Sequence, residues 1–115
     1  MSSLNKVTII GNVGNNPEGR VTANGRSVTT ISVATNEQWK SQETLQTRTE
    51  WHRIVLWDRL AEIAVENLAK GCRVYIEGRL QTRSWQDSSG NKRFSTEIIA
   101  SQLKFLDKAR SEAVA

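Results

Sequence analysis

Residues 50–57, EWHRIVLW, constrain the fold most strongly because their side chains alternate in character. Alternation with a period of two is the pattern of a β-strand whose two faces meet different surroundings. One face carries Trp51, Arg53, Val55 and Trp57, and the other carries His52, Ile54 and Leu56. The aliphatic face predicts contact with a core, and the tryptophan–arginine face predicts a surface that meets something else.

The rest of the chain also reads mainly as strands. Extended, β-branched patterns cover residues 5–12, 20–22, 27–35, 72–85 and 92–106, and turn-forming residues separate them at 14–19, 24–25 and 87–91. Residues 36–47 are polar and lack periodicity, which indicates either an exposed, mobile loop or a long hairpin tip.

A single helix is predicted at residues 59–70. Asp58 is expected to cap its first turn, and Gly71 is expected to end it. Its buried stripe is Leu60, Ile63, Ala64 and Leu68.

This order places one helix between the third and fourth strands, which favours a small closed barrel over a sandwich. We therefore predict an all-β, mainly antiparallel, five-stranded OB-fold barrel. A chain of 115 residues suits one domain, expected at residues 1–106, with a short and frayed tail at 107–115. Predicted core residues are Ile54, Leu56, Ile63, Leu68, Val74 and Ile76.

Composition limits the chemistry that this chain can perform. One cysteine, Cys72, permits no internal disulfide, and together with the single histidine it is too small a ligand set for structural zinc, so no metal is expected. Lys and Arg exceed Asp and Glu by 16 to 12, an excess compatible with a polyanionic partner. No apolar run approaches the roughly 20 residues of a membrane helix, and no signal segment precedes the first strand, so a cytoplasmic protein without membrane contact is expected.

Tryptophan is the more informative residue type, since it supplies four of the seven aromatic side chains. Because aliphatic residues already fill a small core, Trp51 and Trp57 are surplus apolar surface, which usually marks a binding face. An exposed indole can stack on a nucleotide base of any identity, and Arg53 between the two can neutralise a phosphate.

Catalysis is not predicted. Glu50 and His52 share a strand face and could act as an acid–base pair, but a nucleophile, a metal-ligand set and an oxyanion hole are missing. We therefore expect no catalytic residues and no cofactor.

An ordered set of short motifs runs through about residues 4–100. They are Asn5-Lys6-Val7, Ile10-Gly11-Asn12-Val13-Gly14, Pro17-Glu18, Asn24-Gly25, Ala34-Thr35, Thr49-Glu50-Trp51-His52-Arg53, Leu60-Ala61-Glu62, Lys70-Gly71, Val74-Tyr75-Ile76-Glu77-Gly78 and Thr82-Arg83-Ser84-Trp85. In this set the chain resembles the bacterial-type single-stranded DNA-binding proteins.

The resemblance implies an OB-fold that assembles as a homotetramer, binds single-stranded DNA, and serves replication, repair and recombination in the bacterial cytoplasm, at the nucleoid. It assigns base stacking to Trp39, Trp51, Trp57 and Trp85, and backbone contacts to Lys6, Arg20, Arg53, Arg59, Lys70 and Arg83. It assigns His52 and Tyr75 to a subunit interface. Trp57 stands where the family often carries Phe, and Val21 where it often carries an aromatic residue.

Members of that family usually continue into a Gly/Pro/Gln-rich linker with an acidic tip that recruits other replication proteins. This sequence carries no such tip, so it is expected to be either truncated or naturally tailless, and no tail-mediated partner is assigned.

Three alternatives stay open at this point: a dimeric OB-fold accessory protein of the primosome, a nucleic-acid-processing enzyme using Glu50 and His52, and a protein-interaction module whose tryptophan face meets a protein partner.

Overall fold

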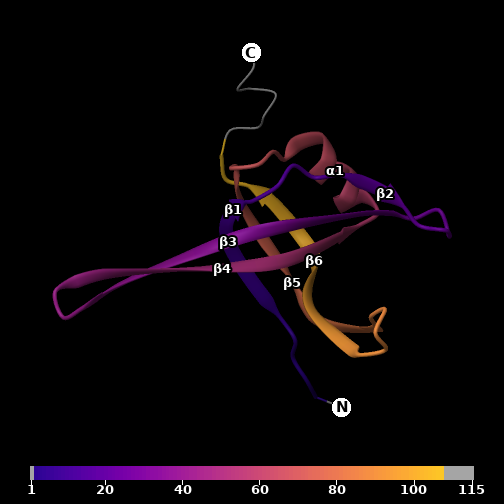
Figure 1. Ribbon diagram of the computed structural model, residues 1–115. Coiled ribbons are helices and arrows are strands. Elements are labelled where there is room, and N and C mark those ends of the chain that lie inside the picture. The colour runs from indigo at the N-terminus through magenta and orange to yellow at the C-terminus, as the bar shows by residue number, and fades with distance from the viewer. Residues whose placement is uncertain (1, 108–115) are drawn as a thin grey trace.

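A closed barrel with one helix forms the body of the molecule (Figure 1). The computed structural model describes residues 2–107. Its elements, in chain order, are β1 (Val7–Val13), β2 (Gly19–Val21), β3 (Ser27–Ser41), β4 (Thr44–Trp57), α1 (Arg59–Asn67), β5 (Arg73–Gln86) and β6 (Lys92–Phe105).

The strands lie in the order β1-β5-β6-β4-β3-β2, and pairing of β1 with β3 closes the ring. Neighbours are antiparallel except β4 and β6, which pair in parallel at Ile54↔Ile98 and Val55↔Ile99. The five longer strands make the barrel, and α1 lies between the third and fourth of them, β4 and β5. The predicted five-stranded OB-fold is therefore confirmed. The three-residue strand β2 is an addition on the outer edge of β3.

The core contains the aliphatic residues that strand alternation predicted. Ile54, Leu56, Leu68, Val74 and Ile76 are all fully buried, and burying each such side chain contributes about 1.5–3 kcal/mol. Ile63 is only half-buried, and the fully buried residues of α1 are Ala61 and Ala64, of which Ala64 was predicted.

The ends of the helix differ from the prediction. It stops at Asn67 rather than residue 70, because Leu68 adopts an extended backbone with φ −90° and ψ 149°. Asp58 makes no side-chain capping hydrogen bond, so its predicted capping role is wrong. Its carboxylate binds Arg26 instead.

Residues 36–49 form a two-stranded arm, so the mobile-loop interpretation is wrong and the hairpin interpretation is right. Pairing of β3 with β4 continues without a break from the barrel to Ser41↔Thr44, and the arm projects from the barrel in Figure 1. Gln42 and Glu43 make the turn with φ values of 50° and 66°. Every side chain of the arm is exposed, so no core imposed an alternating pattern on its sequence.

Barrel closure requires a close backbone approach at Gly11. A Cβ atom on this residue would overlap the carbonyl oxygen of Ala34 across the β1–β3 contact. That contact covers only Asn12↔Ala34 and Val13↔Val33, whereas β5 pairs with β1 from Val7 to Asn12. Within residues 2–107, the second edge of β1 therefore has no strand partner from residue 7 to residue 11.

The expected frayed tail falls outside the described residues apart from Asp107, whose carboxylate accepts a 2.7 Å hydrogen bond from the Arg73 backbone N–H. Among the residues described, no helix has the length and apolar character needed to cross a bilayer.

Candidate nucleic-acid interface

A groove of about 420 Å³ lies on the tryptophan–arginine face of β4. It draws residues from five strands: Arg20 and Val21 of β2, Val28 and Thr30 of β3, Arg53, Val55 and Trp57 of β4, Arg83 of β5 and Glu97 of β6, with Thr22 beside β2. The groove brings together one predicted stacking residue and three predicted backbone-contact arginines. Val21 lines the same groove.

A buried carboxylate orders two of these arginines. Glu97 Oε2 accepts a hydrogen bond of 2.8 Å from Arg53 Nε and one of 3.4 Å from Arg83 Nη2. Its side chain is 8% exposed, whereas the arginine side chains are 48% and 51% exposed. The carboxylate is thus neutralised from both sides, and each guanidinium is held in place while still open to solvent. The strand alternation gave no sign of Glu97, because its burial depends on arginines that two other strands supply.

Arg83 connects this groove with the next tryptophan along the surface. Its guanidinium carbon lies 5.0 Å from the centroid of the Trp85 ring, within range of a cation–π interaction. Trp85 is 42% exposed. On the paired strand, Phe94 is also exposed, and Lys92 Nζ lies 5.5 Å from its ring centroid. The sequence analysis missed this second aromatic–cation pair, although Phe94 follows two basic residues.

Trp51 is the most exposed of the four tryptophans, at 57%. It pairs with Ala34 of β3, and its ring rests on the backbone of Gly14, where a Cβ atom would overlap the indole. Pairing of β3 with β4 is unbroken from Trp51 to Arg53, so these two residues lie on the same face of β4, as the alternation predicted. Trp39 is 46% exposed and stands on the β3–β4 arm, away from the groove residues.

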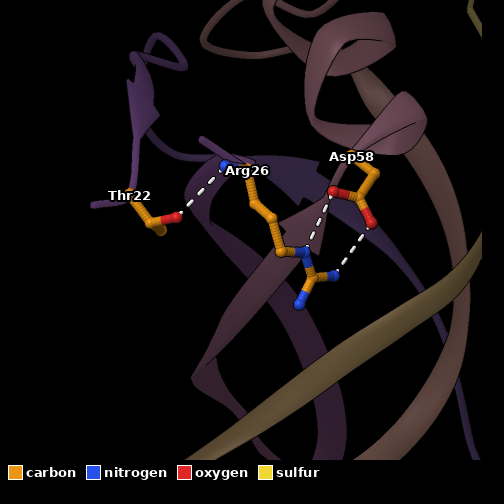
Figure 2. A network of polar contacts seen from close by, with 3 residues as sticks. All are labelled: Thr22, Arg26 and Asp58. Carbon is orange, nitrogen blue, oxygen red and sulfur yellow. Dashed lines mark hydrogen bonds and ion pairs between the residues drawn. The ribbon is translucent and has the colours of Figure 1, made fainter. Parts of the chain in front are cut away.

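Trp57 has a charged partner that the sequence analysis did not predict. The guanidinium carbon of Arg26 lies 4.4 Å from the centroid of the indole. Arg26 Nε and Nη2 donate hydrogen bonds of 3.2 and 2.8 Å to the two carboxylate oxygens of Asp58, as Figure 2 shows. A tight turn fixes the backbone of Arg26, whose N–H donates to Thr22 Oγ1 at 3.2 Å.

The ion pair perturbs both groups. The hydrogen bond from Arg26 lowers the pKa of Asp58 below its ordinary value, and the same bond raises the pKa of Arg26. Asp58 therefore stays ionised, and Arg26 stays charged, throughout the neutral range.

The other three predicted cations lie outside the groove. Lys6 forms an ion pair with Glu77 at 3.7 Å and lines a separate hollow that also contains Arg79. Arg59 is the first residue of α1. Lys70 donates its backbone N–H to Asn16 Oδ1 at 2.9 Å, and Asn16 lines a hollow that shares Arg20 and Thr30 with the groove.

The two predicted interface residues have polar partners. His52 is half-buried, and its Nε2 lies 2.9 Å from Thr35 Oγ1. The Tyr75 hydroxyl donates a 2.9 Å hydrogen bond to Glu77 Oε1, which raises the pKa of the phenol. Glu50 pairs with Arg48 at 3.1 Å. Residues 2–107 hold no group of three or more His, Cys, Asp or Glu side chains that could bind a metal.

Comparison with known proteins identifies one family. The model of the single-strand binding protein family matches residues 4–106. Single-stranded DNA-binding protein 1 of Chlorobaculum tepidum is 54% identical over 105 residues, which are 90% of this chain and 65% of that protein. Single-stranded DNA-binding protein 1 of Xylella fastidiosa is 46% identical over 110 residues, 94% of this chain and 81% of that protein.

A solved structure agrees with both. The structure described as the Plasmodium falciparum SSB complex with ssDNA superimposes with a TM-score of 0.86 at 40% identity, covering 93% of this chain and 98% of that one. The curated relatives are named as DNA-binding proteins and not as enzymes. This chain thus spans slightly less than two thirds of the Chlorobaculum protein.

Proposed function

The chain belongs to the single-strand binding protein family, and from that premise we propose that it binds single-stranded DNA without reading the base sequence. One observation carries the proposal: Trp51, Arg53 and Trp57 share one face of β4. Arg83 and Trp85 continue this aromatic and cationic surface onto β5. Duplex DNA hides its base faces within the stack, so this mixture suits unpaired bases.

Base stacking is assigned to Trp39, Trp51, Trp57 and Trp85. Every base has a π-face, so a platform of indoles accepts any sequence. Three of the four are between 42% and 57% exposed, which leaves ring surface for a base, and Trp57 lines the groove.

Phosphate contacts are assigned first to Arg20, Arg53 and Arg83, which line the groove. Because Glu97 already orients two of them, a phosphate meets guanidiniums that need little further ordering. Lys6, Arg59 and Lys70 extend the proposed path over the surface beyond the groove.

We propose that the protein acts in DNA replication, repair and recombination in the bacterial cytoplasm. Residues 1–106 are its single-stranded DNA-binding domain. No tail-mediated protein partner is assigned.

We also propose a homotetramer with His52 and Tyr75 at subunit contacts. Within residues 2–107, one edge of β1 has no strand partner from residue 7 to residue 11, and Ile10, which pairs with Tyr75, is 48% exposed. Together they offer a surface for a second copy. Mass measurement in solution tests the assembly. A tetramer is expected, and a dimer would favour an accessory scaffold instead.

Binding of labelled deoxythymidine oligonucleotides, followed by fluorescence anisotropy, tests the function. Mixed-sequence and thymidine oligonucleotides should bind within about tenfold of each other, and an equal mass of duplex should not compete. Phe105→Leu, which removes an aromatic ring at the C-terminal end of β6, serves as the control for variants of the stacking tryptophans. Strong discrimination between sequences, or effective competition by duplex, would overturn the proposal.

A further inference from the structure

Arg26 sits on Trp57 but belongs to none of the predicted contacts. Trp57 lines the groove, the guanidinium covers one face of its ring at 4.4 Å, and Asp58 holds the guanidinium by two hydrogen bonds (Figure 2). The Arg26 and Asp58 side chains are 53% and 58% exposed. Arg26 is therefore an ordered, solvent-exposed cation beside Trp57, which lines the groove.

The guanidinium keeps unused donors. It has five N–H groups, and within residues 2–107 its recorded hydrogen bonds are the two to Asp58. Because those two occupy the Nε side, the N–H groups of Nη1 point away from the carboxylate. One N–H of Nη1 and the second N–H of Nη2 form the remaining parallel pair of donors, which matches two oxygens of a phosphate.

Asp58 occupies a costly backbone position. Its φ of 56° and ψ of −121° lie in a region that glycine adopts readily and other residues avoid. The side chain makes no helix-capping hydrogen bond that would offset the cost of this backbone conformation. Among the described residues its recorded bonds go to Arg26, so orienting Arg26 is what the carboxylate does.

We propose that Arg26 is a further single-stranded DNA contact, which binds the backbone phosphate of the nucleotide whose base meets Trp57, and that Asp58 is its positioning residue. The inference rests on the proposed function. Asp58 then acts in two opposing ways, since its negative charge repels the strand while its hydrogen bonds hold Arg26 ready.

Arg26→Gln tests the contact. Binding of a thymidine oligonucleotide should weaken at least threefold, and the slope of log affinity against log salt should fall by about 0.7, the value for one phosphate on a single strand. Arg26→Lys, which keeps the charge, should retain most of the slope. The control is Arg73→Gln, an exposed arginine at the start of β5 that does not line the groove and should leave the slope within about 0.2 of wild type.

A double-mutant cycle tests the positioning role. Asp58→Asn removes a negative charge and should tighten binding in the Arg26→Gln background. With Arg26 intact the same change should be at least threefold less favourable, because the guanidinium loses its orientation. Additive effects would mean that Asp58 only repels DNA, and the positioning role would be rejected.

Failure of the inference is distinguishable from failure of the proposed function. If wild type does not bind the oligonucleotide, the function itself is wrong. If wild type binds and Trp51→Ala weakens binding, but Arg26→Gln behaves like Arg73→Gln, only the Arg26 contact is refuted. Thermal melting of each variant checks that the fold is intact.

Discussion

At the scale of single residues, the contact between Gly14 and Trp51 sets where the most exposed indole lies. The ring rests on a backbone that carries no side chain, and a Cβ atom at this position would overlap it. Because the indole is 57% exposed, it can swing outward without disturbing the core. The position of Trp51, a proposed stacking residue, therefore depends on Gly14, which is not itself among the proposed DNA contacts.

Gly14→Ala should displace the Trp51 ring and weaken binding by up to about 3 kcal/mol, the upper range per stacked base established on single-strand-binding OB-folds themselves. Equilibrium titration with a thymidine oligonucleotide measures the loss. In a Trp51→Ala background the same change should have no further effect. A full additional loss in that background would show that Gly14 acts through the fold instead.

Individual residues also show which parts of the site can be predicted from the sequence and which cannot. Alternation along β4 correctly placed Trp51, Arg53 and Trp57 on one face, because the period of a strand is a local property. Arg26–Asp58 and Arg53–Glu97 join residues 32 and 44 positions apart, so they depend on strand register that no local pattern encodes. The predicted capping role of Asp58 is wrong for this reason: its local context suits a helix cap, and its partner lies far away in the sequence.

At the scale of elements, the β3–β4 arm and the barrel follow different rules. Barrel strands bury one face, so apolar and polar residues alternate along them, and this alternation allowed the strands to be predicted. The arm is held by strand pairing from Asn36↔Thr49 to Ser41↔Thr44 with all its side chains exposed. Its turn at Gln42 and Glu43 also lacks the Asn-Gly signature of positive-φ turns.

Replacing residues 37–48 by Asn-Gly should therefore leave the barrel folded and remove only the contribution of Trp39. The free energy of unfolding should change by less than about 1 kcal/mol, since no core residue is lost. DNA affinity should fall by the same amount as in Trp39→Ala, within about twofold. Loss of cooperative urea unfolding would contradict this independence of arm and barrel.

The β5–β6 hairpin depends on a charged turn residue. Asp87 accepts hydrogen bonds from Arg93 Nε and from the backbone N–H groups of Asn91 and Ser89, each at 2.9 Å. The bond from Arg93 contributes most to lowering the pKa of Asp87 below its ordinary value of 3.8, followed by the bond from Asn91. This turn fixes the hairpin that presents Trp85 and Phe94.

The lowered pKa makes this contribution pH-dependent. Since the folded state holds the proton less tightly than the unfolded state, Asp87 stabilises the fold above pH 3.8, and the contribution is lost as the pH falls below 3.8 through the folded-state pKa. Urea midpoints of wild type and Asp87→Ala should differ at neutral pH and converge as the pH falls below 3.8. A gap that persists at low pH would mean that the turn does not need the charge.

At the scale of the whole molecule, the groove predicts how binding depends on salt. Arg20, Arg53 and Arg83 converge there from three strands, although the net charge of the chain is only +4. Each phosphate neutralised on a single strand contributes about −0.7 to the slope of log affinity against log salt. Arg20→Gln should therefore make the slope shallower by about 0.7, whereas a slope identical to wild type would exclude Arg20 from the contact.

Intrinsic tryptophan fluorescence reports on whether the exposed tryptophans stack on unpaired bases. The protein should be titrated with poly(dT) and, separately, with duplex DNA of equal length. Strong quenching by poly(dT) with little response to duplex is the predicted result, because only unpaired bases can reach the indoles. Absence of quenching, or an equal response to duplex, would contradict the account and indicate that the tryptophan face meets a different partner.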